Sequence, residues 1–203
     1  MPSHHAPKDE IAEALWPEDA NGVKNLHAAA HDVRGWLGDG ALLAYSSSEY
    51  SLQSCSIDID EFEQLAKRGR GLWAADPASA LDYYRAALLI YRGPFLPDEL
   101  YAEWITTRRH RLQERFVDAA LKVGRCLLDE NDPEGALELA VEISQLDEAI
   151  EDAARLEMEA LARLGRRGQA LRRFERLRLF LNREFHCRPD PATEAVRTRV
   201  LSL

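Results

Sequence analysis

The sequence predicts a mainly α-helical protein, in which tetratricopeptide-like helix pairs follow a shorter region that contains a small β-hairpin. From Ile57 onward, apolar residues recur every three or four positions, and no run alternates as a half-buried strand does. The second half of the chain repeats itself at a spacing of 34 residues. Strand-like runs are confined to residues 41–53, ALLAYSSSEYSLQ, where two short runs flank a serine turn.

The region before the hairpin is predicted to form two helices joined by a loop. The first spans residues 8–15 and ends at Trp16, because the residue before a proline is disfavoured in the α region. The second spans residues 23–38 and is expected to stop at Gly38 and Gly40. Its inner face is predicted from a spacing of four, three and four residues between Leu26, Ala30, Val33 and Leu37.

A series of helices is predicted after the hairpin. They span residues 58–75, a segment from Pro77 to the break at Gly93, residues 98–129, 133–146, 149–164 and 167–185, and a last short segment after Pro191. The residues expected to face inward in the first two are Ile59, Phe62, Leu65, Ala66, Leu72 or Trp73, and then Ala80, Tyr84, Ala87, Leu88 and Tyr91.

The repeat identifies how these helices are expected to pack. At a shift of 34 residues, Leu127 falls over Leu161, Ala136 over Ala170 and Leu137 over Leu171, with NDPEGAL over GRRGQAL in the turns. ADPASAL at residues 75–81 is a third copy of the turn. This spacing is the tetratricopeptide period, in which each helix pair buries its apolar face against the next pair.

Composition limits the class of protein. A chain of 203 residues, 46% hydrophobic and 30% charged, is typical of a globular protein of one or two domains. No window approaches the run of about 18 apolar residues that a membrane span requires. The N-terminus, MPSHHAPKDE, has neither the basic start nor the apolar stretch of a signal peptide, so we expect a cytoplasmic protein with no membrane partner. The three cysteines, Cys55, Cys126 and Cys187, form no CxxC pair, which argues against disulfides and zinc.

No motif in the sequence predicts an enzyme. A glycine-rich phosphate loop, a nucleophile elbow and a carboxylate pair with a histidine base are all missing from a strand-to-helix context, so we predict no catalytic residues and no cofactor. His27 and His31 stand four apart on a predicted helix, a spacing that suits a metal ion. Because no third ligand follows, we predict no metal site.

Charge is distributed unevenly along the chain. The net charge is −9, which counts against a large nucleic-acid footprint, since such footprints consist of Lys and Arg side chains. Residues 1–54 contain three basic and eight acidic side chains, a net of −5. Residues 166–188 contain eight arginines and two glutamates, a net of +6.

Residues 57–203 contain an ordered series of motifs. They are DIDEFEQLAKRG, ADPASALDYYRAALLIYRGPFLPDELYAEWITTRRHRL and a run from VDAALKVGRCLLDENDPEGAL to RPDPATEAV. The acidic and Phe residues of the first helix, the YRG run, Trp104 with Arg108 and Arg109, and Arg188-Pro189 follow one another in order. This series resembles the bacterial transcriptional activator domain of SARP-type antibiotic regulatory proteins.

In that family, the helical domain follows a winged helix of the OmpR type. Residues 6–52 resemble its second and third helices and its wing, including Leu15-Trp16-Pro17 and the Tyr50 and Leu52 of the return strand. The resemblance implies a partial winged-helix DNA-binding region in residues 1–54 and the tetratricopeptide-like activator domain in residues 55–203. The family's winged helix begins with a small antiparallel sheet and a first helix, and we expect nothing before Pro7 to supply them. Either the chain begins inside that domain or the domain has decayed.

The resemblance implies that the helix of residues 23–38 contacts DNA. Its predicted outer face carries Lys24, Asn25, His27, His31 and Arg34. Asn and Arg side chains read base edges, and His or Lys side chains hold phosphates. Asp32, Gly35 and Trp36 occupy positions that are basic or polar in the family, and a carboxylate repels phosphate. The alternative interpretation of this face is an ordinary solvated helix surface.

The arginine-rich helix near residues 166–183 is the candidate partner-binding element. Its candidate residues are Arg166, Arg172, Arg173 and Arg176. Such a surface suits DNA or an acidic protein, for example a polymerase subunit. A solvated face that closes the repeat array is the alternative.

Two functions from different classes follow. The first is a DNA-binding transcriptional activator, whose partners are double-stranded DNA, RNA polymerase or a sensory protein, and a second copy of the chain in a homodimer. The second is a tetratricopeptide-like interaction module whose degenerate winged helix no longer binds DNA. The order of the family's motifs favours the activator, and the acidic first 54 residues favour the interaction module.

Overall fold

The polypeptide divides into two units. The computed structural model describes residues 4–38, 42–53, 55–98 and 103–203, with the backbone alone for residues 103 and 104. One unit consists of Met1–Ile57 and Leu96–Thr107, and the other of Asp58–Phe95 and Arg108–Leu203. We call them the N-terminal unit and the helical domain.

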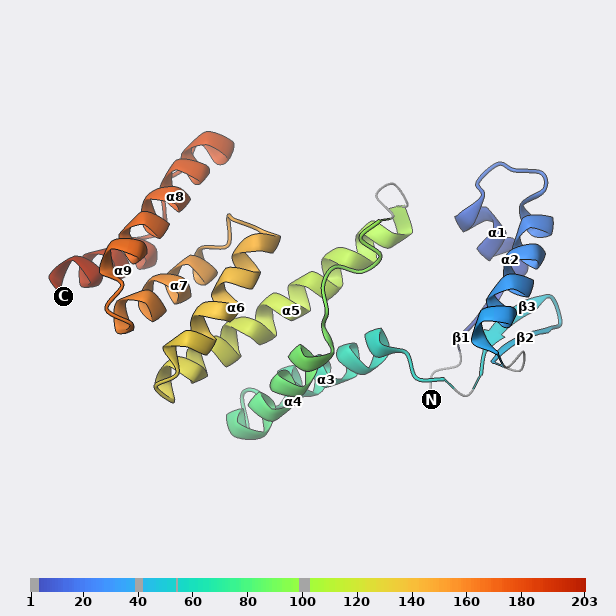
Figure 1. Cartoon of the computed structure of the whole chain (residues 1–203), viewed down its shortest axis with the longest axis horizontal. Helices are drawn as coiled ribbons and strands as arrows, with labels where there is room; N and C mark the ends of the chain where they lie inside the picture. Colours follow the sequence, from blue (N-terminus) through green and yellow to red (C-terminus); the bar gives the residue numbers. More distant parts are fainter. Residues whose placement is uncertain (1–3, 39–41, 54, 99–102) are drawn as a thin grey trace. The chain divides into compact units, whose positions relative to one another are not determined.

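The N-terminal unit consists of two helices and a three-stranded antiparallel sheet (Figure 1). Its elements are β1 (His4–Pro7), α1 (Lys8–Leu15), α2 (Gly22–Leu37), β2 (Leu43–Ser46) and β3 (Glu49–Leu52). The sheet has the order β1-β3-β2, so the return strand of the hairpin lies in the centre, and Tyr45 faces Tyr50 across the hairpin. Its core cluster is formed by Ala12, Leu26, Ala30 and Tyr50.

Two predictions for this unit were wrong. No strand was expected before Pro7, but β1 pairs with β3 from His4–Leu52 to Pro7–Glu49. Strand pairing uses backbone groups, so four residues without an alternating pattern join a sheet when a neighbouring edge is open. Leu37 was placed on the inner face of its helix, but it is 44% exposed. It lies in the last turn of α2, beyond the part of the helix that contributes Leu26 and Ala30 to the core cluster.

The helical domain confirms the predicted mainly α-helical, tetratricopeptide-like class. Its helices are α3 (Asp58–Leu72), α4 (Pro77–Ile90), α5 (Glu103–Asp129), α6 (Pro133–Leu146), α7 (Glu151–Arg163), α8 (Arg167–Phe185) and α9 (Pro191–Ser202). The residues of α5 from Arg108 onward belong to this domain. The long helix was expected from Asp98, but residues 99–102 and the Trp104 side chain lie outside the described part of the chain.

The 34-residue repeat appears as two equivalent turns. Asn131 and Gly165, 34 positions apart, both have a left-handed backbone, with φ of 63° and 72°. The next amide in each turn bonds back to an equivalent carbonyl, Asp132 to Leu127 at 2.7 Å and Arg166 to Leu161 at 2.8 Å. This pattern ends a helix by satisfying its last carbonyls. The equivalent Ala136 and Ala170 are both fully buried.

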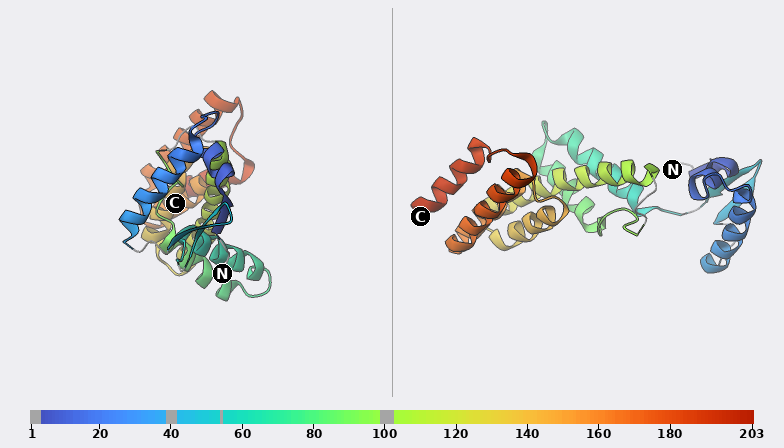
Figure 2. Two further views of the ribbon diagram at one scale, coloured as in Figure 1. Left: turned by 90° about the vertical axis from the view of Figure 1, so that its right-hand side faces the viewer. Right: turned by 90° about the horizontal axis from the view of Figure 1, so that it is seen from above.

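The core of the helical domain runs continuously through its helices. Helices α3 and α4 form a hairpin, and α6, α7 and α8 lie side by side in Figures 1 and 2. One cluster joins α3 to α7 and contains Phe62, Ala66, Ala87, Leu112, Phe116, Ala120, Ile143 and Ala153. A second joins α7, α8 and α9 through Met158, Leu161, Ala170, Phe174, Val196 and Val200. The small side chains allow helices to approach closely, and a Cβ on Gly124 of α5 would lie 2.5 Å from Leu156 Cδ2 of α7.

The predicted inner faces of the first two helices are confirmed. Phe62, Ala66, Ala80, Tyr84 and Ala87 are buried. The remaining predicted residues are partly buried against the same clusters; they are Ile59, Leu65, Leu72, Trp73, Leu88 and Tyr91. In the described part of the chain, no helix is both long and apolar enough to cross a membrane.

Candidate functional site

The outer face of α2 carries the residues predicted to contact DNA. Leu26 and Ala30 face the core of the N-terminal unit, which leaves the opposite face of the helix towards solvent. Lys24, His27 and His31 are exposed, and Asn25 and Arg34 are partly buried. The structure therefore brings these side chains onto one helix, but their environments differ.

Arg34 fastens α2 to the hairpin. Its Nε donates a hydrogen bond to the carbonyl oxygen of Leu43 at 2.8 Å. Its guanidinium carbon lies 5.9 Å from the centre of the Tyr50 ring, within the range of a cation–π contact. A guanidinium held in this way stabilises the unit, and it has fewer free donors for a base edge or a phosphate.

His27 also contacts the hairpin. Its Nδ1 lies 2.7 Å from the hydroxyl oxygen of Tyr50, so one of these groups donates to the other. The Tyr45 ring lies 4.8 Å from the Tyr50 ring, centre to centre, and completes an aromatic cluster. Burial raises the pKa of the Tyr50 phenol, the charge of Arg34 opposes this, and Tyr45 adds to it. The phenol therefore stays protonated and available for the His27 contact at neutral pH.

Of the other three candidate residues of α2, one is bonded and two have no partner among the described residues. The side-chain amide of Asn25 donates to the Asp19 carboxylate at 3.0 Å, which ties the helix to the preceding loop. Among the described residues, Lys24 and His31 have no hydrogen-bond or ion-pair partner. Beside them, Trp36 is 86% exposed. The cationic surface available to DNA is therefore small.

The four candidate arginines of α8 and its N-cap also differ in environment. Arg166 pairs with Glu134 at 2.8 Å, and Arg176 with Glu148 at 2.9 Å. Arg173 is 3% exposed and donates from Nε to Glu157 at 2.6 Å. Within the described part of the chain, Arg172 has no ion-pair or hydrogen-bond partner.

Three of these arginines line one groove between α6, α7 and α8, which we call the arginine groove. Its volume is about 480 Å³, and its walls are formed by Leu137, Val141, Glu157, Leu161, Gln169, Arg172, Arg173 and Arg176. A second hollow shares Val141, Glu157 and Arg176 with it and extends it towards Ser144, Gln145 and Glu148. Three of the arginines that were predicted to form a basic partner-binding surface therefore line a groove whose walls also contain apolar side chains.

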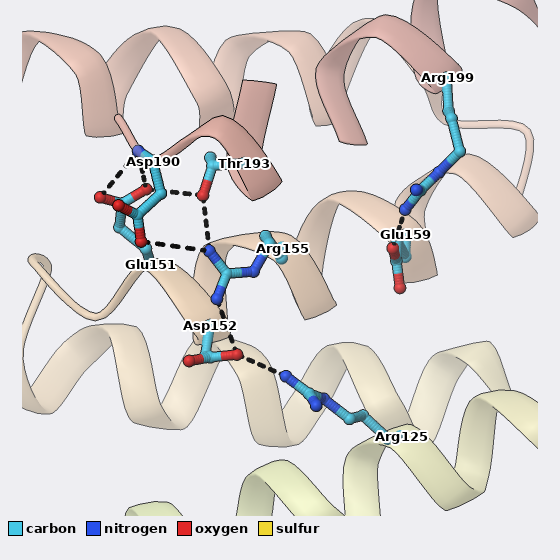
Figure 3. Close-up of polar contacts among 8 residues, drawn as sticks. All are labelled: Arg125, Glu151, Asp152, Arg155, Glu159, Asp190, Thr193 and Arg199. Atoms are coloured by element: carbon cyan, nitrogen blue, oxygen red, sulfur yellow. Dashed lines mark hydrogen bonds and ion pairs between the residues drawn. The ribbon is translucent and has the colours of Figure 1, made fainter. Parts of the chain in front are cut away.

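A separate polar cluster joins α7 to the start of α9 (Figure 3). The Glu151 carboxylate accepts bonds from the Asp190 amide at 2.9 Å and the Thr193 hydroxyl at 2.6 Å. Arg155 donates to Thr193 at 2.8 Å and pairs with Asp152 at 2.8 Å. Each of these charges has a partner within the cluster, so we assign it a structural role.

The same cluster reaches the neighbouring helices. Asp152 also pairs with Arg125 of α5, and Arg199 of α9 pairs with Glu159 of α7 at 2.5 Å (Figure 3). These contacts link α5, α7 and α9. In the described residues, no group of three His, Cys, Asp or Glu side chains is arranged to hold a metal ion, and this includes the surroundings of His27 and His31.

Sequence reasoning did not predict the carboxylate partner of Arg173 or the contact between Tyr45 and Tyr50. Glu157, the partner of Arg173, lies between Leu156 and Met158 on the buried side of α7. A lone carboxylate in an apolar helix face was a usable signal, because such a charge needs a buried cation. Tyr45 and Tyr50 were a second signal, since residues equally spaced from a hairpin turn face each other.

The fold and these surfaces define a tetratricopeptide-like helical-repeat protein with a small α/β unit at its N-terminus. The chain belongs to the family of the bacterial transcriptional activator domain, whose family model matches residues 57–201. Comparison with curated proteins gave no match.

Two solved structures share the fold. A structure of EmbR from Mycobacterium tuberculosis, in complex with a low-affinity phosphopeptide, matches with a TM-score of 0.71 and 21% identity. The match covers 97% of this chain and 55% of EmbR, so the chain spans about half the length of that protein. The C-terminal TPR-containing domain of a Plasmodium falciparum FK506-binding protein matches with a TM-score of 0.53 and 12% identity, over 71% of this chain and 89% of that one.

Proposed function

We propose that this regulator binds double-stranded DNA through the exposed face of α2 and activates transcription through protein contacts of its helical domain. In this proposal, residues 1–54 are a DNA-binding region of the winged-helix type and residues 55–203 are the activator domain. RNA polymerase or a sensory protein is the partner of the helical domain, and a second copy of the chain completes a homodimer. The observation that carries the proposal is the family match over residues 57–201.

The geometry of the N-terminal unit supports a role for α2. The helix packs by one face on α1 and Tyr50, and the hairpin that follows it is fixed by Arg34 and His27. Such an arrangement leaves the other face free to enter a major groove, with the first residues of the helix nearest the bases. Lys24 lies in this first part of α2 and is exposed.

The direct test is selection from a randomised duplex pool, with sequencing of the bound fraction, followed by binding of the enriched duplex in a salt series. An enriched motif whose affinity falls as salt rises is expected. Lys24→Ala should weaken binding and reduce the slope of log K against log salt by about 1, because one phosphate contact is lost. Lys67→Ala, an exposed lysine on α3, is the matched control and should leave the slope unchanged.

One result of this selection would contradict DNA binding. No enriched motif at low salt, from a chain with a native helical spectrum, would contradict the proposal. Arg34→Ala is a poor substitute for Lys24→Ala, since Arg34 also holds the hairpin through the Leu43 carbonyl.

A protein-interaction module that does not touch DNA is the second candidate function. Asn25, His27 and Arg34 are engaged within the N-terminal unit, which itself carries a net charge of −5 over residues 1–54. Repulsion of phosphate by this charge reduces the salt-dependent part of the affinity. Under this function, the helical domain binds its partner with the same strength in the presence and absence of duplex DNA.

A further inference from the structure

The arginine groove contains a buried cation with an unused donor. Arg173 gives its Nε to Glu157 and its Nη2 to the Ser144 hydroxyl at 3.1 Å. Its Nη1 is buried and has no hydrogen-bond partner. The Arg173 side chain is only 2% exposed. Leaving a buried donor unbonded costs free energy, so a hydrogen bond from this donor to an acceptor would be favourable.

A second cation stands beside it without a partner. Arg172 lines the same groove, is exposed, and forms no ion pair with any described residue. Arg173 and Arg172 are adjacent in sequence, so α8 presents two guanidinium groups to one hollow. The first turn of α8 contributes Gln169 to the wall, and the positive end of the helix dipole adds to the potential there.

The carboxylates of the groove are already paired. Glu157 is bound by Arg173, and Glu148 by Arg176 at 2.9 Å. The three arginines and two glutamates therefore leave a net of about one positive charge, centred on Arg172. A site with this balance suits one carboxylate, because each further negative charge would lie near Glu157 or Glu148 without a free cation.

The remaining walls are apolar. Leu137 and Val141 of α6 and Leu161 of α7 face the groove, and Val141 is 36% exposed. A nucleic-acid backbone needs an open row of cations and gains nothing from aliphatic walls beside a carboxylate. An apolar side chain next to an acidic one fits both halves of the groove.

We propose that the arginine groove binds a peptide segment of a partner protein in which an Asp or Glu side chain neighbours a Leu, Ile, Val or Phe side chain. The ligand carboxylate accepts hydrogen bonds from Arg172 and from the free Nη1 of Arg173, and the apolar side chain packs on Leu137 and Val141. This site deepens the proposed function, because it names the chemistry of the partner that the helical domain of the regulator would contact.

The test uses the whole 203-residue chain as bait for a phage-displayed library of random short peptides. Enriched peptides are synthesised with a fluorescent label, and their affinities are measured by anisotropy. Enrichment of acidic residues next to aliphatic or Phe residues is expected. Arg172→Glu should weaken binding of an enriched peptide by about tenfold or more, because an attractive charge becomes repulsive.

Two further variants separate the groove from general charge effects. Val141→Asp places a carboxylate on the apolar wall and should weaken binding as strongly as Arg172→Glu. Arg183→Glu makes the same charge change on an exposed position of α8 that does not line the groove, and it should change affinity by less than about twofold. Arg172, Val141 and Arg183 are all exposed, so the three variants are expected to keep the wild-type helical spectrum.

The proposal is overturned if no peptides are enriched, if the enriched peptides lack acidic residues, or if Arg172→Glu and Val141→Asp bind them as the wild type does. The same variants are measured on the enriched DNA duplex. Loss of peptide binding in Arg172→Glu with unchanged DNA binding separates this site from the DNA-binding proposal. Conversely, if the wild-type chain selects peptides but no DNA duplex, the peptide-binding proposal is supported and the DNA-binding proposal is contradicted.

Discussion

The core cluster of the N-terminal unit consists of Leu26, Tyr50 and two alanines, whereas the helical domain buries Phe62, Tyr84, Phe116 and Phe174 and many aliphatic side chains completely. The free energy gained from burial grows with the apolar area removed from water, so the smaller unit has less to gain. It compensates with polar contacts between α2 and the hairpin. His27 and Arg34, two of its candidate DNA-binding residues, make those contacts.

The helical domain distributes its polar residues differently. Its large core does not use Arg172, which has no partner among the described residues, and Arg173 keeps one unused donor although it pairs with Glu157. The contrast teaches that a polar group is available for a ligand only when the fold leaves that group unbonded. On this argument, the strongest site for a partner lies in the helical domain rather than on α2.

The largest effect is expected from breaking the buried ion pair between Arg173 and Glu157 in the helical domain. Arg173→Ala leaves the Glu157 carboxylate buried without its cation, and we expect the free energy of unfolding to fall by about 3–5 kcal/mol. Denaturant unfolding followed by circular dichroism measures this. The double variant Arg173→Met with Glu157→Leu replaces the pair by apolar side chains and should cost at most about 1 kcal/mol. An equal loss in both variants would mean that packing, rather than charge, sets the stability here.

The second prediction tests whether the small core of the N-terminal unit is independent. Leu26→Ala should cost about 2–3 kcal/mol and lower only the first of two thermal transitions, because the cluster around Leu26 does not include residues of the helical domain. Leu37→Ala removes the same side-chain atoms at an exposed position and should cost less than about 0.5 kcal/mol. A single calorimetric transition that shifts as a whole would show that the two units unfold together.

A smaller effect compares the two equivalent turns of the helical domain. The Asp132 carboxylate accepts a bond from the Gly135 amide and caps α6, so Asp132→Ala should cost about 1 kcal/mol. Arg166 occupies the equivalent position 34 residues later and makes no side-chain cap for α8, so Arg166→Ala should cost less than about 0.5 kcal/mol. The two unfolding midpoints in urea measure the difference. Equal losses would refute the assignment of the cap.

The smallest expected effect is a loss of stability of both units at alkaline pH. Burial raises the pKa of Tyr50 in the N-terminal unit, and burial together with Glu142 raises that of Tyr91 in the helical domain. A raised folded-state pKa favours the protonated phenol. The stability from each phenol is therefore complete below the unfolded value of about 10 and is lost as the pH rises through the folded value. Melting temperatures between neutral and alkaline pH measure this loss.

Single phenol deletions assign the alkaline loss to a unit. Tyr50→Phe should remove the pH dependence of the first transition alone, and Tyr91→Phe that of the second. An unchanged alkaline loss in Tyr50→Phe would show that other groups control the stability of the N-terminal unit at high pH.

The sequence predicted most of the fold because its signals are local. Apolar spacing placed the helices, and turn residues such as Asp132-Pro133 and Gly165 marked their boundaries. The candidate arginines were also visible, as a basic run. The groove that three of them line was not predicted, because its walls come from α6 and α7 as well as α8.

By itself, the sequence determined the mainly helical class, the repeat and the family resemblance, since each depends on periodicity and on the order of motifs along the chain. Only the tertiary structure decided which polar side chains are free. Arg34 and Arg172 look alike in sequence, yet one bonds the Leu43 carbonyl and the other has no partner among the described residues. The pairing of a charge depends on which residues lie close in space, and those residues belong to other elements of the fold.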